Sequence, residues 1–270
     1  MLRKLLKYDM QSIWKLFLFF AASILVMSLL GGLAVRFLST NENDALFLME
    51  MIAGLFLFLN VMAIAAFAVI IEIMVYYRFY KNLFTDEGYL TFTLPISRAK
   101  ILASKTINAC IWTVATMLTI FLAVLEIFLI VDPNSLRELL RIPPEVAPWL
   151  ILYVPLTLFA GLMLIGCTIG VIQFCITTGA VVAKKYKIVV AIGIYYLFSM
   201  VSSSVMQILG MVGSIALEGA IDSLSANITG TEGYLLGAVI ILAVGAIAAC
   251  IAFTLHFLTL GHIERRLNLS

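Results

Sequence analysis

Six stretches of the chain contain no charged residue over 20 or more consecutive positions, and this pattern constrains the fold more than any other feature. The stretches are 16–35, 51–71, 106–125, 146–183, 188–217 and 233–263. A helix needs about 20 apolar residues to cross the hydrocarbon core of a bilayer. Hydrophobic residues make up 63% of the 270-residue chain and charged residues 12%, too apolar a balance for a water-soluble domain. The sequence therefore predicts an all-α integral membrane protein and excludes a soluble enzyme or a nucleic-acid-binding protein.

The uncharged stretches and their flanks predict six transmembrane helices within a single transmembrane domain over 1–270. We place these spans over residues 16–37, 51–77, 101–126, 148–182, 188–208 and 234–260. The fourth stretch has 38 residues and raises the alternative of two crossings. Two crossings need about 40 residues and a turn, and this stretch contains no polar turn. One long helix is therefore the better interpretation.

The basic residues predict the orientation of these spans. Fourteen of them fall on the side that holds the two termini and three on the opposite side. The fourteen are Arg3, Lys4, Lys7, Lys15, Arg78, Lys81, Arg98, Lys100, Lys105, Lys184, Lys185, Lys187, Arg265 and Arg266, and the three are Arg36, Arg137 and Arg141. Cytoplasmic loops carry an excess of Lys and Arg, so we expect both termini to be cytoplasmic.

Residues 2–15 form a basic amphipathic segment in front of the first span. At 100° per residue its leucines, Met10 and Ile13 share one face and its lysines the other. This pattern predicts an interfacial elbow helix in the inner headgroup layer. Asp9 falls within the apolar face, where its carboxylate either pairs with a basic residue of another segment or reaches water. The sequence leaves both alternatives open.

The expected cytoplasmic segment 82–95 is too apolar to be a simple connector. It places Phe84, Tyr89, Leu90, Phe92 and Leu94 beside the acidic Asp86 and Glu87. Aromatic side chains in a cytosolic loop need a surface to bury against, either the membrane interface or another protein. The two carboxylates favour a protein, because the inner leaflet is anionic and repels them.

On the opposite side, residues 209–232 are rich in glycine and small side chains and carry three acidic residues without a basic one. We expect a short re-entrant or interfacial helical hairpin there. Deeper polar residues, Asn60, Ser202, Ser203 and Gln207, predict a substrate path. The alternative is that these four side chains form hydrogen bonds between helices.

The sequence contains no motif that would make the chain an enzyme. It has no P-loop, no H-E-x-x-H metal motif and no G-x-S-x-G nucleophile motif. Glu72 and Glu126 are the acidic residues nearest to the spans, and each is expected close to an interface. We therefore expect no catalytic residue, no metal site and no cofactor on this chain.

The chain resembles the bacterial ABC transporter permeases of the type-2 exporter class, with a Firmicutes-like character. The resemblance lies in Leu5-Leu6-Lys7-Tyr8-Asp9, in the six-span topology, and in the run from Asp86-Glu87-Gly88-Tyr89 to Pro95-Ile96-Ser97. It implies an elbow helix, short outer helices between the last two spans, and a coupling helix that docks on a separately encoded P-loop ATPase. The implied contact residues are Phe84, Asp86, Glu87, Gly88, Tyr89, Leu90 and Phe92.

The resemblance predicts a working unit of two permease chains, identical or different, and two ATPase chains that bind ATP and Mg. We therefore expect the permease subunit of an ATP-driven exporter in the bacterial plasma membrane. It would move an amphiphilic, drug-like or peptide substrate outward by alternating access. The alternative is an ABC-like sensor or scaffold that binds a ligand without transporting it.

Overall fold

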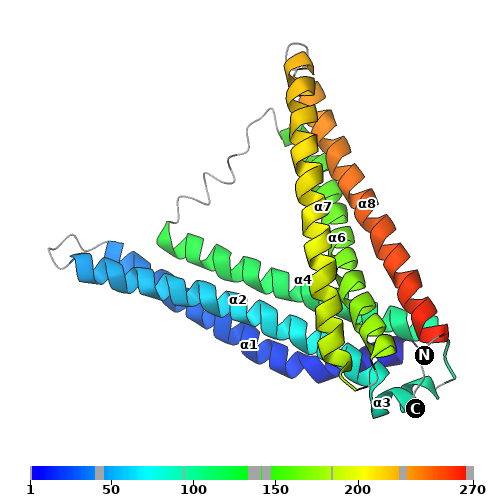
Figure 1. Ribbon diagram of the computed structural model, residues 1–270. Coiled ribbons are helices and arrows are strands. Elements are labelled where there is room, and N and C mark those ends of the chain that lie inside the picture. The colour runs from blue at the N-terminus through cyan, green and yellow to red at the C-terminus, as the bar shows by residue number, and fades with distance from the viewer. Residues whose placement is uncertain are drawn as a thin grey trace. The chain divides into compact units, whose positions relative to one another are not determined.

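The computed structural model describes residues 2–39, 46–93, 95–132, 141, 147–183, 185–224 and 230–265 (Figure 1). Within these residues all regular structure is helical. The helices are α1 (Leu2–Ser39), α2 (Leu46–Phe84), α3 (Asp86–Phe92), α4 (Arg98–Val131), α6 (Ala147–Val182), α7 (Lys187–Leu224) and α8 (Gly230–Arg265). The predicted all-α class is confirmed for this part of the chain.

Six of these helices are long and apolar enough to cross a membrane, and α3 is the short one. The candidate spans are Arg3–Phe37, Met51–Phe84, Arg98–Val131, Pro148–Val182, Lys187–Val205 and Gly233–Glu264. The protein is a multi-pass membrane protein, as its uncharged stretches predict. Several helices extend beyond the predicted spans, because hydropathy marks the part of a helix that lies in the hydrocarbon core and not the end of the helix.

Two segments differ from the sequence prediction. The elbow expected over 2–15 is not a separate helix, because α1 continues without a break from Leu2 to Ser39. No proline interrupts this helix, and the Ser12 hydroxyl donates to the Asp9 carbonyl at 3.0 Å within it. Over 209–232, where the sequence predicts a short re-entrant or interfacial helical hairpin, α7 runs to Leu224 and α8 begins at Gly230, while 225–229 lie outside the described residues.

The chain forms two compact units. Unit 1 comprises Met1–Asn82 and Lys100–Pro144, and unit 2 comprises Leu83–Ala99 and Glu145–Ser270. The last two residues of α2, all of α3 and the first two residues of α4 thus belong with α6, α7 and α8. This division places the expected coupling segment almost entirely within unit 2.

In unit 1, α1, α2 and α4 run side by side (Figure 1). Contacts between α1 and α4 advance in the same direction along both helices, from Asp9–Lys105 to Ser28–Glu126. These two helices are therefore parallel. At the centre of the unit the ring of Phe17 lies 5.8 Å from that of Phe67 and 4.9 Å from that of Trp112, so one aromatic cluster joins all three helices.

In unit 2, α6 packs against both α7 and α8 (Figure 1). Glycines allow the backbones to approach closely, as is common between membrane helices. A Cβ at Gly179 of α6 would lie 2.7 Å from the Cα of Ala191 on α7. At the other end of α6, the Tyr153 hydroxyl donates to the Tyr234 carbonyl of α8 at 2.6 Å. These contacts fix α6 between its two neighbours.

Candidate functional site

The short helix α3 follows α2 after a single residue, Thr85. Its first turn carries Asp86 and Glu87, whose negative charges favour the N-terminus of a helix. The helix ends where the Thr93 amide donates to the Tyr89 carbonyl at 3.1 Å. The segment that the sequence predicts as an apolar-acidic surface is thus a defined helix of seven residues.

Gly88 allows α3 to fold back against the end of α2. It is buried, and a Cβ at this position would lie 2.5 Å from the carbonyl oxygen of Leu83. Real Cβ atoms do not approach backbone oxygens so closely, so only glycine fits without a shift of one helix. The close approach orients the other residues of α3 relative to Leu83 and Phe84, the last two residues of α2.

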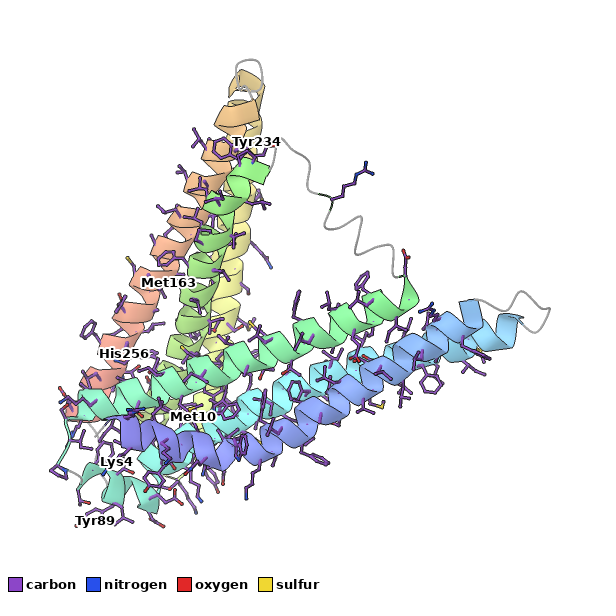
Figure 2. The ribbon with its side chains drawn as sticks, turned by 180° about the vertical axis from the view of Figure 1, so that it is seen from behind. Lys4, Met10, Tyr89, Met163, Tyr234 and His256 are labelled. Atoms are coloured by element: carbon purple, nitrogen blue, oxygen red, sulfur yellow. The ribbon has the colours of Figure 1, made fainter. Side chains whose placement is uncertain are left out.

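One face of α3 is open. Tyr89 is 64% exposed and Leu90 68% exposed, and Asp86 and Glu87 are exposed beside them. Figure 2 shows Tyr89 projecting away from the ribbon. We call these four residues the α3 face. It combines an aromatic ring and an aliphatic side chain with two carboxylates, a combination suited to binding a protein surface that carries basic groups.

Three residues of the predicted contact set do not belong to this face. Phe84 is only 4% exposed and packs inside the protein, because it ends α2 rather than beginning the loop. Gly88 is buried under the turn described above. Phe92 is half-buried, with the guanidinium carbon of Arg98 at 5.5 Å from its ring centroid. The exposed members of the predicted contact set are therefore the four residues of the α3 face.

Two cations connect the ends of the α3 segment to long helices of unit 2. The Arg98 guanidinium donates to the carbonyls of Ile263 at 2.8 Å and Glu264 at 3.1 Å, in the last turn of α8. The Lys187 ammonium, at the start of α7, donates to the Phe84 carbonyl at 3.5 Å. The chain on either side of α3 is therefore bound to α7 and to α8.

Sequence reasoning counted Arg98 and Lys187 only as part of the basic excess and missed their contacts. A signal exists: each is the first residue of its helix. A cation is disfavoured at a helix N-terminus and favoured at a C-terminus. A basic residue at the first position of a helix therefore indicates a partner elsewhere.

The polar residues predicted to form a substrate path lie in different units. Asn60 belongs to α2 in unit 1, is 2% exposed, and neither amide atom has a hydrogen-bond partner within the described residues. Ser202, Ser203 and Gln207 belong to α7 in unit 2. The Ser203 hydroxyl donates to the Met200 carbonyl of its own helix at 2.9 Å, and Gln207 is exposed. These positions do not form one site within either unit.

Three acidic residues of unit 1, Asp9, Glu72 and Glu126, have a polar partner on another helix. Asp9 is paired with Lys105 at 2.6 Å, which settles the alternative left open by the sequence. Glu72 accepts a hydrogen bond from Thr113 at 2.8 Å, and Glu126 accepts one from Ser28 at 2.7 Å. These contacts join α1, α2 and α4 into one polar framework.

No protein-family model, curated protein or solved structure matches this chain.

Proposed function

We propose that the protein is the transmembrane permease subunit of an ATP-driven exporter and that the α3 face binds a separate P-loop ATPase. The observation that carries this proposal is the α3 face itself. Tyr89 and Leu90 are largely exposed on a short helix between two membrane-spanning helices. Large apolar side chains displayed on a rigid element mark an interaction site.

The charges of the α3 face support a protein partner over the lipid surface. Asp86 and Glu87 lie beside the two apolar residues and are exposed. Carboxylates at this position would be repelled by the anionic lipids of the inner leaflet, whereas basic residues on a protein would complement them. The positive-inside bias supports a cytoplasmic location for this helix and for both termini. The resemblance to bacterial exporter permeases supports the bacterial plasma membrane as its location.

The chain contributes no ATP-binding motif, so ATP and Mg belong to the partner ATPase in this proposal. Two permease chains and two ATPase chains form the working unit. Closure of the ATPases on ATP would pull on both α3 faces and shift the permeases between inward-open and outward-open states. An amphiphilic, drug-like or peptide substrate fits a membrane domain with few fixed charges.

The test is co-purification of the chain from its native membrane, followed by identification of bound proteins by mass spectrometry. Tyr89→Ala and the pair Asp86→Ala with Glu87→Ala should reduce the bound ATPase at least about tenfold, as loss of interface anchors does. Tyr186→Ala is a matched control, because Tyr186 is also 64% exposed but lies outside α3.

Recovery of the wild-type chain without any P-loop ATPase would contradict the proposal. Equal recovery of the ATPase by all variants would contradict the assignment of the α3 face. Transport in sealed proteoliposomes separates an exporter from the sensor or scaffold alternative. The exporter moves substrate across the bilayer when ATP is supplied, whereas the alternative hydrolyses ATP or binds ligand without any net movement.

A further inference from the structure

We infer that Arg98 is a positioning residue that makes α3 move as one body with the end of α8, and that Lys187 connects the same segment to the start of α7. The inference rests on the proposed function and adds to it: it names the helices that receive the motion of the ATPase. The structure supports it by three contacts, all within unit 2.

The first contact joins the end of the α3 segment to α8. Arg98 occupies the first position of α4, where its charge opposes the helix dipole. Its guanidinium instead reaches the last turn of α8 and donates to two successive carbonyls, those of Ile263 and Glu264. These carbonyls belong to the last four of a helix, which lack partners within the helix. The guanidinium therefore supplies hydrogen bonds to two carbonyls that would otherwise lack a partner at the end of α8. The same interaction offsets the unfavourable placement of its positive charge at the N-terminus of α4.

The second contact joins the same guanidinium to α3. Its central carbon lies 5.5 Å from the ring centroid of Phe92, the last residue of α3. A guanidinium over an aromatic ring at this distance is attracted to it. Arg98 thus contacts the end of α3 and the end of α8 at once, and a displacement of one is transmitted to the other through a single side chain.

The third contact joins the start of the α3 segment to α7. Lys187, at the first position of α7, donates to the Phe84 carbonyl at the end of α2. The arrangement repeats that of Arg98: a cation at one helix N-terminus is bound to a carbonyl at another helix C-terminus. With Leu83 and Phe84 buried and Gly88 packed on Leu83, both ends of α3 are fixed within unit 2.

This connection can be tested by spin-label distances on the full chain in detergent, with the four native cysteines replaced. Labels at Thr93→Cys, beside α3, and at Leu258→Cys, an exposed position on α8, report the distance between the two elements. The parent chain should give a narrow distance distribution. Arg98→Ala should broaden or shift it, Arg98→Lys should restore part of it, and Lys100→Ala should leave it unchanged. Lys100 is the matched control because it is an exposed cation two residues further along α4.

A second readout uses the complex with the ATPase. Arg98→Ala should bind the ATPase as well as the parent chain, since Arg98 is not part of the α3 face. Transport per ATP hydrolysed should fall about tenfold, the scale expected for losing hydrogen bonds from a charged group. Arg98→Lys should recover part of this ratio. A general loss of folded protein would lower transport and ATP hydrolysis together and would leave their ratio unchanged.

Two results would overturn the inference: an unchanged distance distribution in Arg98→Ala, or an unchanged ratio of transport to ATP hydrolysis. Failure of the proposed function would look different. In that case the parent chain would recruit no ATPase, while the spin-label distances would still respond to Arg98→Ala.

Discussion

The Lys105 ammonium lies 2.6 Å and 2.7 Å from the two carboxylate oxygens of Asp9, with the side chains only 6% and 13% exposed. The contact joins α4 to α1 across 96 residues of sequence. Asn82 of α2 donates a further hydrogen bond to Asp9 at 3.4 Å. The Asp9 carboxylate of α1 therefore contacts both other helices of unit 1, α4 through Lys105 and α2 through Asn82.

Lys105→Met should destabilise unit 1 strongly. It leaves the Asp9 carboxylate buried without its cation, a change that costs about 3–5 kcal/mol when one partner of a buried pair is removed. Thermal unfolding in detergent, followed by size-exclusion chromatography of the heated samples, measures the loss.

The double variant Lys105→Met with Asp9→Leu is its control. It removes both charges and should recover most of the lost stability, because apolar pairs often replace buried ion pairs at little cost. Equal destabilisation by the single and the double variant would contradict the role assigned to the pair.

Gly88→Ala should impair binding of the ATPase although alanine favours helix formation by about 1 kcal/mol. The added Cβ would lie 2.5 Å from the Leu83 carbonyl oxygen, so α3 must shift away from α2. The side chains of the α3 face then point in a different direction from those of the parent chain. ATPase recovery by affinity purification should fall, whereas Gly193→Ala, at a position with open space around it, should bind normally. Normal binding by Gly88→Ala would show that the orientation of α3 is not critical.

Gly179→Ala and Gly161→Ala form a pair on one helix with opposite expected effects. A Cβ at Gly179 meets the backbone of Ala191 at 2.7 Å, and overpacking of this kind costs about 1–3 kcal/mol. Nothing lies within 4 Å of a Cβ at Gly161, so that variant should keep or raise the stability through helix propensity. The thermal unfolding midpoint should therefore fall for Gly179→Ala and stay unchanged or rise for Gly161→Ala. A lower midpoint for Gly161→Ala than for Gly179→Ala would contradict the packing of α6 on α7.

Asn60→Leu distinguishes the two interpretations of this buried residue. Neither amide atom has a partner within the described part of the chain, and an unsatisfied buried polar group costs about 1–3 kcal/mol. The substitution should therefore keep or raise the unfolding temperature. If Asn60 lines the substrate path, transport should fall at the same time. A lower unfolding temperature would instead show that the amide forms hydrogen bonds between helices.

The number of spans could be predicted because hydropathy responds directly to the lipid environment. The helix ends could not, since α7 continues to Leu224 through a glycine-rich segment in which the sequence predicts a hairpin. Asp9 was identifiable as a charge on an apolar face that needs a partner. Lys105 was not identifiable as that partner, because a single sequence contains no signal that pairs two residues 96 positions apart.

The α3 segment shows the same limit at shorter range. Its composition predicts an interaction surface, but which of its residues face outward depends on how Gly88 packs on Leu83. Phe84 was therefore assigned wrongly to the surface: it is buried. The roles of Arg98 and Lys187 depend on backbone carbonyls, which every residue type supplies equally.

That dependence on main-chain acceptors has an evolutionary consequence. Substitutions at Phe84, Ile263 and Glu264 leave the oxygens that receive the hydrogen bonds in place, whatever side chain follows. Only the two donors are constrained in their chemistry. In homologous chains, the positions of Arg98 and Lys187 should therefore remain basic, while the exposed position of Glu264 should accept many residue types. The residue types at the donor positions should not covary with those at the acceptor positions.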